Sequence, residues 1–342
     1  MELKKEDSKM LQGLSVLAMV WLHLFNKEYQ GLFIPNVFLG GIPLSFYISQ
    51  LSDFCVFGFA FCSGYAHMFL AKEDNYYRKR LKGVWSLLCN YWLILIIFCI
   101  ISILIGQADF MPGSIGKFLA NALTLDNSYN GAWWYMFTYI VLVLISPVVL
   151  KLVDKLHPIG VMIIGFLIYC CAYYVRFYFE TGNWFLTKFG PFGMTFFEYL
   201  IGAVCYKTRM ITKIYSIWKK IPTLLRGIVA GVLVVGMLYG HTKIIPSLFI
   251  APVTGSVVML LFHFWKKPNL VQRFFLMIGK HSTNIWVIHM FFYANIFKGF
   301  VYIAKYPVLI YGLMLGVTLM ASVLLMQINC LTKKLSSCIC RK

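Results

Sequence analysis

Long apolar stretches, separated by short polar segments, recur along the whole chain. At 1.5 Å per helical residue, each is long enough to cross about 30 Å of hydrocarbon. The pattern predicts ten membrane-spanning helices, near residues 10–26, 45–71, 83–106, 132–153, 157–178, 190–206, 222–241, 246–265, 281–303 and 306–331. We therefore expect an all-α, polytopic integral membrane protein. The long second span can begin as a separate re-entrant or interfacial piece.

The composition supports a membrane protein and excludes an ordinary soluble domain. Hydrophobic residues make up 60% of the 342 residues and charged residues 13%, against about 45–50% and about 25% in soluble domains. The net charge of +19 would suggest nucleic acid only if the basic residues shared one folded face. They lie instead in short runs between apolar segments, as the positive-inside rule predicts. No nucleic-acid partner is expected.

The basic residues also predict an orientation for the ten spans. If the N-terminus is cytoplasmic, 24 of the 31 Lys and Arg residues fall on the inner side. The remaining seven are Lys27, Lys117, Arg176, Lys188, Lys243, Lys298 and Lys305. A miscounted span would reverse the sides downstream and remove this bias, so we expect both termini to be cytoplasmic.

The chain is expected to form a single transmembrane domain over 1–342, with a short cytoplasmic tail at about 332–342. The largest outer loop, near 107–131, contains "SIGKFLANALTL", which predicts a short amphipathic helix at the membrane surface. Most of the ten cysteines fall inside spans, where cysteine is a small apolar filler. No spacing of Cys and His suggests a metal site.

Ionisable residues inside spans are the first candidates for function, because their exposure to lipid is so unfavourable. His23 lies in the outer half of the first span and His289 lies mid-span in the ninth, while Asp53 and Glu198 are the clear mid-span carboxylates. A neutral histidine there can act as a general base. Either carboxylate could orient a histidine or hold a substrate hydroxyl. The alternative for all four is an interhelical hydrogen bond that only fixes packing.

The other five histidines are weaker candidates. His67 and His263 fall near inner helix ends, where we expect them to reach toward water. The remaining three, His157, His241 and His281, lie at helix ends or interfaces.

Two further clusters have both a functional and a structural explanation. Trp133, Trp134 and Tyr135 open the fourth span, as an aromatic belt would. The run "YYRKRLKG" (76–83) can anchor the chain on the inner side, but its arginines could equally bind a phosphorylated donor.

Four stretches together resemble the acyltransferase 3 family, whose members O-acylate cell-surface sugars in the membrane. In "LQGLSVLAMVWLH", Gly13 and the histidine ten residues later match the family's first helix. "FCVFGFAFCSGYAHMFL" followed by "YYRKRLKGVWSLLCNYW" resembles its Phe-rich helix and basic loop. "AWWYMFTYIVLVLISPVV" is similar to its Trp-Tyr-led helix, and "IGKHSTNIWVIHMFF" to a late-helix pattern. The four occur in order between residues 7 and 295, and ten helices is the family's usual number.

The resemblance implies roles for individual residues. His23 would be the catalytic base, and Arg78 and Arg80 would bind the donor. Asp53 and Glu198 are the further catalytic candidates, as residues that could orient the histidine. Gln12 stands where the family has an arginine, so this position offers hydrogen bonding but no charge. Substrate would contact Trp134, Tyr135 and His289.

The implied activity is transfer of an acyl group, expected to be acetyl, from acyl-CoA to a hydroxyl of a cell-surface or exported sugar, in the fucose 4-O-acetylase-like branch. Acetyl-CoA would be a co-substrate, with no permanently bound cofactor and no metal. The expected partners are the acyl-CoA, a polysaccharide or lipid-linked sugar acceptor and membrane lipid, and the expected location is a bacterial inner or plasma membrane. A transporter or flippase for a saccharide precursor is the alternative, although no paired broken helices support it. A membrane sensor with a degenerate acyltransferase fold is a third interpretation, which Gln12 keeps open.

Overall fold

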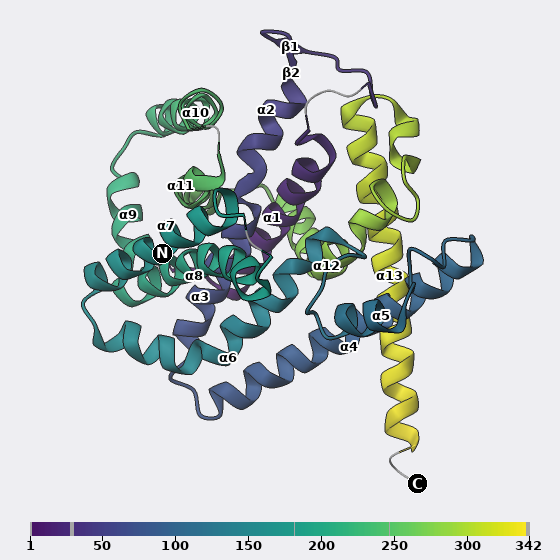
Figure 1. Cartoon of the computed structure of the whole chain (residues 1–342). Coiled ribbons are helices and arrows are strands. Elements are labelled where there is room, and N and C mark those ends of the chain that lie inside the picture. Colours follow the sequence, from purple (N-terminus) through teal and green to yellow (C-terminus); the bar gives the residue numbers. More distant parts are fainter. Residues whose placement is uncertain (1, 28–30, 181, 246, 340–342) are drawn as a thin grey trace. The chain divides into compact units, whose positions relative to one another are not determined.

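The protein is built almost entirely from helices. The computed structural model describes residues 2–27, 31–180, 182–245 and 247–339, with only the backbone described for 332–339. Helices account for 79% of the chain. Within the described ranges, the only strands are β1 (Phe38–Leu39) and β2 (Ile42–Pro43), which form a short antiparallel hairpin (Figure 1). The all-α prediction is confirmed.

Thirteen α-helices and five short helical turns follow one another in the described residues. The α-helices are α1 (Lys5–Phe25), α2 (Leu44–Leu51), α3 (Cys55–Leu70), α4 (Tyr76–Leu104), α5 (Ile115–Ala122), α6 (Trp134–Lys155), α7 (Pro158–Phe177), α8 (Trp184–Thr208), α9 (Met210–Trp218), α10 (Thr223–Tyr239), α11 (Ala251–Phe264), α12 (Asn269–Tyr293) and α13 (Pro307–Ile339). The short turns are η1 (Ser52–Phe54), η2 (Gly131–Trp133), η3 (Gly240–Ile244), η4 (Leu248–Ile250) and η5 (Phe300–Ala304).

Seven helical segments of the described chain are long and apolar enough to cross a membrane. They are Lys5–Phe25, Leu44–Leu70, Tyr76–Leu104, Gly131–Lys155, Pro158–Phe177, Thr223–Ile244 and Pro307–Leu331. Each coincides with one of the ten predicted spans. The predicted eighth span is the shorter apolar segment Leu248–Phe264. The predicted sixth and ninth spans coincide with α8 and α12, which are long helices but do not meet the same hydropathy criterion.

Two predicted boundaries are refined by the structure. The second span is broken at η1, which separates α2 from α3, as its length suggested. The ninth span was wrongly placed, because α12 starts at Asn269 and ends at Tyr293 rather than covering 281–303. After Tyr293 the chain continues through turns to Gly299, whose positive φ of 84° is a conformation that suits glycine. The predicted tail at about 332–342 continues α13 to Ile339, and its last residues lie outside the described chain.

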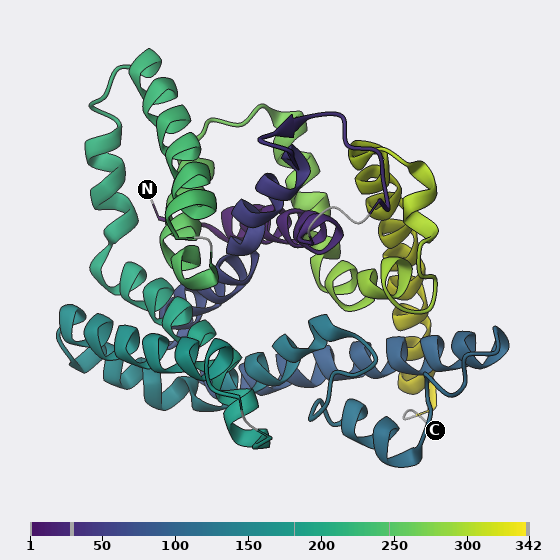
Figure 2. The same cartoon turned by 45° about the horizontal axis from the view of Figure 1, so that its top comes forward.

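The chain divides into two compact units. The first comprises residues 1–28, 37–78 and 138–280, and the second comprises 29–36, 79–137 and 281–342. In the first unit, α8 packs against both α3 and α7, and α1 packs against α3. Figure 2 shows α7 and α8 side by side, as does Figure 1. Phe57, Phe61 and Tyr65 fill the centre of this unit, so its helices are held by buried aromatic side chains.

In the second unit, buried and half-buried polar groups join three helices. The amide of Asn90 on α4 donates to Asn284 on α12 over 2.8 Å, and Asn329 on α13 donates back to Asn90 over 2.5 Å. His281 lies 2.8 Å from the hydroxyl of Ser322. Hydrogen bonds of this kind stabilise helix packing within apolar surroundings.

The loop near residues 107–131, in the second unit, contains the predicted amphipathic helix. α5 begins after Ser114, whose hydroxyl accepts the amide of Lys117 over 3.2 Å as an N-cap. The buried Tyr129 donates to the carbonyl of Pro112, and burial raises the pKa of Tyr129 to about 12. The hydroxyl therefore stays a neutral donor, and the loop is tied to itself.

Candidate active site

The last turn of α1 carries His23 and is held on both sides by α2. The indole of Trp21, two residues before His23, donates to the carbonyl of Ser45 over 3.0 Å. The hydroxyl of Ser49 donates to the carbonyl of Phe25, two residues after His23, over 3.1 Å. His23 itself is half-buried. Because the two contacts are made by residues that flank the histidine, α2 holds the last turn of α1 that carries its ring.

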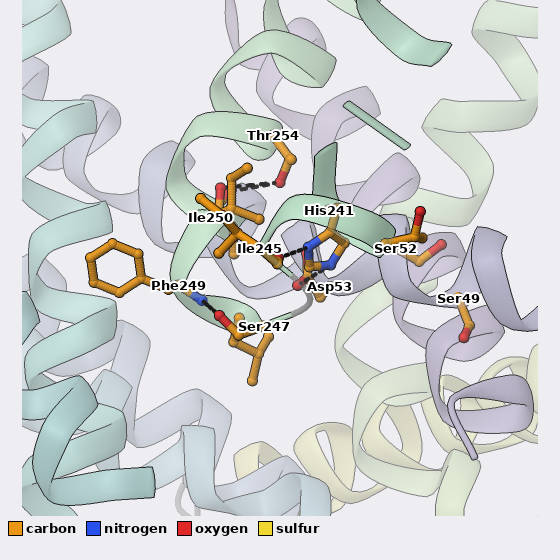
Figure 3. Close-up of polar contacts among 12 residues, drawn as sticks. Ser49, Ser52, Asp53, His241, Ile245, Ser247, Phe249, Ile250 and Thr254 are labelled. Atoms are coloured by element: carbon orange, nitrogen blue, oxygen red, sulfur yellow. Dashed lines mark hydrogen bonds and ion pairs between the residues drawn. The ribbon is translucent and has the colours of Figure 1, made fainter. Parts of the chain in front are cut away.

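α2 leads directly into a buried pair of ionisable side chains, Asp53 and His241. Asp53 lies in η1, and His241 lies in η3, the π-helical turn that ends the α10 span. Nε2 of His241 is 2.9 Å from Oδ2 of Asp53, and the two side chains are 1% and 5% exposed (Figure 3). The approach is close but not directed as a hydrogen bond should be, so we describe it as an ion pair.

The other nitrogen of the His241 ring also faces an oxygen. Nδ1 lies 3.3 Å from the carbonyl of Ile245, as Figure 3 shows. An imidazolium carries a proton on each ring nitrogen, which suits a ring that has an oxygen near both. Both nitrogens of the His241 ring therefore already face protein oxygens, one on Asp53 and one on the carbonyl of Ile245. This suits His241 to hold Asp53 in place and not to accept a proton from a substrate.

Glu198 brings a second carboxyl group close to Asp53. It lies on α8 and is 4% exposed. The charges of Asp53 and of Arg176 on α7 are near enough to act on it. Within the described residues, Oε2 of Glu198 and Oδ1 of Asp53 have no hydrogen-bond partner. Buried polar atoms are almost always paired, so these two oxygens are candidates to accept hydrogen bonds from a bound hydroxyl compound.

At the other end of α1, Gln12 is paired with a cation. Its Oε1 accepts a hydrogen bond from the ammonium of Lys9 over 3.2 Å, and both side chains are half-buried. Lys9 precedes Gln12 by three residues and so shares its helix face. Gln12, which stands where the acyltransferase 3 family has an arginine, therefore has the ammonium group of Lys9 beside it.

The two arginines of the basic run start α4. Arg78 is exposed, whereas Arg80 is half-buried, and among the described residues its Nε has no hydrogen-bond partner. Arg78 falls in the first unit and Arg80 in the second. Both guanidinium groups can bind phosphate through paired N–H donors.

In the second unit, α12 lies against the opening of α6. Tyr135 contacts Trp286 edge-to-face at 5.6 Å and contacts Trp134 at the same distance. The indole of Trp286 donates to the carbonyl of Ala132 over 2.9 Å. Together these contacts place the aromatic pair predicted to bind substrate beside α12.

His289, one turn along α12, is fully buried. Its Nδ1 lies 2.7 Å from the carbonyl of Trp286. A carbonyl can only accept, so Nδ1 carries the proton and Nε2 is the basic nitrogen of the neutral ring. The ring also stacks on Tyr293. His289 is thus held in one tautomer.

Sequence reasoning missed four residues that shape these sites. His241 was a weaker candidate because it lies at the end of a span, and Lys9 was not considered as a site residue. The buried Trp133 donates to the carbonyl of Val287 over 2.8 Å, although the sequence did not distinguish it from Trp134. The fourth is Trp286. For His241, the sequence offered one signal. It is an ionisable ring at the end of an apolar run, in a chain that also has a carboxylate, Asp53, inside another predicted span.

The expectation that His67 and His263 reach toward water was wrong. They are 3% and 4% exposed. Nδ1 of His67 lies 3.1 Å from the hydroxyl of Tyr199, and Nδ1 of His263 lies 3.8 Å from a carboxylate oxygen of Asp7. Packing against neighbouring helices buries both rings near the helix ends.

The glycines of the resembling motifs meet in the first unit. Gly13 on α1 faces the backbone of Phe275 and Gly279 on α12, and Gly279 faces the backbone of Lys9. A Cβ atom at either glycine would collide with that backbone. The first and the last motif are therefore joined by close helix contact, which only small residues permit.

Comparison with known proteins agrees with this arrangement. The family described as Acyltransferase domain (Acyl_transf_3) matches residues 7–327, nearly the whole chain. No curated protein and no solved structure matches it. The chain, a membrane acyltransferase, belongs to the acyltransferase 3 family.

Proposed function

We propose that the protein transfers an acetyl group from acetyl-CoA to a hydroxyl of a cell-surface or exported sugar, with His23 as general base. The observation that carries the proposal is the position of His23 in the family's first motif, on a turn that α2 clamps from both sides. A base must hold its geometry to within a fraction of an ångström to be effective. The clamp supplies that rigidity.

In the proposed reaction, His23 takes the proton of the acceptor hydroxyl while its oxygen attacks the thioester carbonyl. The new C–O bond forms as the C–S bond breaks. Coenzyme A leaves as its thiol, taking up the proton that His23 received. A positioned general base of this kind contributes about 10²–10⁴ in rate.

Asp53 and Glu198 have a supporting role in this proposal. Each has a buried carboxyl oxygen that accepts no hydrogen bond within the described residues. Sugar hydroxyls are good donors to such oxygens, and a charged acceptor roughly doubles the strength of the bond. His241 is proposed as a positioning residue, because its ion pair with Asp53 fixes η1 immediately after the helix that clamps His23.

The donor is proposed to bind through basic residues on the side predicted to be cytoplasmic. Arg78 and Arg80 would contact the phosphates of acetyl-CoA. Lys9 would supply, next to Gln12, the charge that the family's arginine supplies elsewhere. The 3.2 Å contact between Lys9 and Gln12 supports this assignment.

Trp134, Tyr135 and His289 are proposed to contact the substrate. Aromatic rings provide flat apolar faces that suit the C–H faces of a sugar ring. His289 lies beside this pair on α12, with its Nδ1 2.7 Å from the carbonyl of Trp286.

The proposed location is a cell membrane with both termini cytoplasmic, where acetyl-CoA is present on the inner side. The direct test is to incubate purified protein with acetyl-CoA labelled in its acetyl group and a crude surface-glycan fraction. Transfer of label to glycan, dependent on the protein, is the expected result. A transporter would consume no thioester. If no coenzyme A is released with any of the acceptors tried, the proposal is contradicted.

A further inference from the structure

A cavity of about 370 Å³ lies in the first unit between the ends of α3 and α6 and the start of α4. Met68, Pro147 and Leu150 contribute an apolar wall. Lys72 and Lys151 contribute two ammonium groups. The volume falls in the range of small-molecule sites, about 300–1,000 Å³. The lining thus offers apolar side chains for a hydrocarbon chain and two ammonium groups for an anion.

Tyr76, one of the residues that line the cavity, is held by hydrogen bonds. Tyr76 is 8% exposed, and its hydroxyl lies 2.9 Å from that of Ser146. Ser146 donates its own proton to the carbonyl of Val143 over 2.8 Å, so Tyr76 must be the donor in their contact. The Tyr76 hydroxyl is also bonded to Tyr199, which lies 3.1 Å from Nδ1 of His67. Because this buried chain uses the hydroxyl of Tyr76, the ring cannot turn to fill the cavity.

The charge around the cavity favours an anionic ligand. Lys72 and Lys151 are exposed and, in the described part of the chain, neither ammonium is paired with a carboxylate. Asp154 is the one acidic residue in the cavity lining. Near it, the ammonium of Lys207 donates to three carbonyls at the end of α6, those of Val153, Asp154 and Leu156, each over 2.8 Å. The lining therefore carries two ammonium groups and one carboxylate, with a third ammonium held at the backbone beside it.

We propose that this cavity binds a phosphate group carried by an amphiphilic molecule, with Lys72 and Lys151 as its counter-ions and the apolar wall against its chain. Two carriers share this chemistry: coenzyme A, with its phosphates and long pantetheine arm, and an anionic phospholipid. Binding of coenzyme A would rest on the proposed acyl transfer, because the cavity would then be part of the donor site. Binding of a phospholipid would not depend on the proposed acyl transfer.

The test compares two double variants that remove equal charge. Lys72→Gln/Lys151→Gln removes both cavity lysines, while Lys155→Gln/Lys213→Gln removes two exposed lysines outside the lining. For the first probe, each full-length protein is placed in phosphatidylcholine nanodiscs, and binding of radiolabelled coenzyme A is measured by equilibrium dialysis. For the second probe, each protein is kept in detergent, and binding of phosphatidylglycerol is measured by native mass spectrometry.

The cavity variant should bind one of the two probes at least about tenfold more weakly, as expected for lost charge-assisted contacts, while the control stays within about twofold of the parent. Loss confined to coenzyme A identifies the donor, and loss confined to phosphatidylglycerol identifies a lipid. Ala71→Phe, which fills the cavity but keeps both lysines, should reproduce the loss.

Three outcomes would overturn the proposal: unchanged binding of both probes to the cavity variant, equal loss in the control, or full binding to Ala71→Phe. These outcomes are separable from failure of the proposed function, because His23→Gln should stop acetyl transfer and leave both binding measurements unchanged.

Discussion

Nε2 of His241 lies 2.9 Å from Oδ2 of Asp53, and both side chains are almost fully buried. The pair joins η3, at the end of the α10 span, to η1, the turn that follows α2. Since α2 also accepts a hydrogen bond from the Trp21 indole and donates one to the Phe25 carbonyl, on either side of His23 in the chain, the ion pair and the histidine turn share one support. This relationship leads to the first prediction.

Asp53→Asn and His241→Gln should each lower both thermal stability and acetyl transfer, because each leaves a buried partner alone. Breaking a buried ion pair by removing one member costs about 3–5 kcal/mol. The double variant should be little worse than the poorer single variant. A double-mutant cycle on Tm and kcat/KM measures this coupling, with Lys243→Gln as a control that removes a neighbouring charge. Strictly additive losses would show that the two residues act independently.

Glu198→Gln keeps the size of the side chain but changes one acceptor oxygen into a donor. If Glu198 holds an acceptor hydroxyl, kcat/KM for the sugar should fall at least about tenfold, as for a lost hydrogen bond to a charged group, with the KM for acetyl-CoA unchanged. Steady-state kinetics with each substrate varied in turn separates the two effects. Glu180→Gln, an exposed site, is the control. A raised donor KM with unchanged acceptor kinetics would contradict the assignment.

Arg78→Ala and Arg80→Ala should each raise the KM for acetyl-CoA. The difference from the parent enzyme should shrink at high ionic strength, because screening weakens the parent's phosphate contacts. Kinetics between low and high salt test this directly. Were the donor KM unchanged in both variants, the basic run would be a topology anchor only.

Lys9→Gln should also raise the KM for acetyl-CoA if Lys9 supplies the charge beside Gln12. Adding Gln12→Arg to that variant should restore donor use, because the arginine returns a cation to the same helix face. The single change Gln12→Arg in the parent should hold or improve it. Donor kinetics of the three variants decide the matter. Failure of Gln12→Arg to rescue Lys9→Gln would mean that this lysine has another role.

The helices were predictable from the sequence because apolar runs of spanning length have few alternatives in lipid. The pairing of helices was not. Asp53 was recognisable as costly to bury, but nothing in the chain order indicates that its partner is His241 and not His23. Likewise Trp133 and Trp134 are adjacent and chemically identical, and only the orientation of each indole in the fold decides which donates to Val287. The ninth span was misplaced because polar residues such as Arg273 and Lys280 interrupt the apolar pattern at the start of α12. The helix nevertheless includes both residues.

The central claim is that His23 removes the proton from the acceptor hydroxyl, and His23→Gln tests it most directly. Glutamine has a similar size and can form hydrogen bonds, but it cannot take up a proton at neutral pH. The measurement is the rate of labelled acetyl transfer by the purified variant, with Tm and coenzyme A binding recorded to show that it is folded. We predict a loss of about 10²–10⁴ in rate with both controls unchanged. Near-parental transfer by the folded His23→Gln protein would contradict the mechanism.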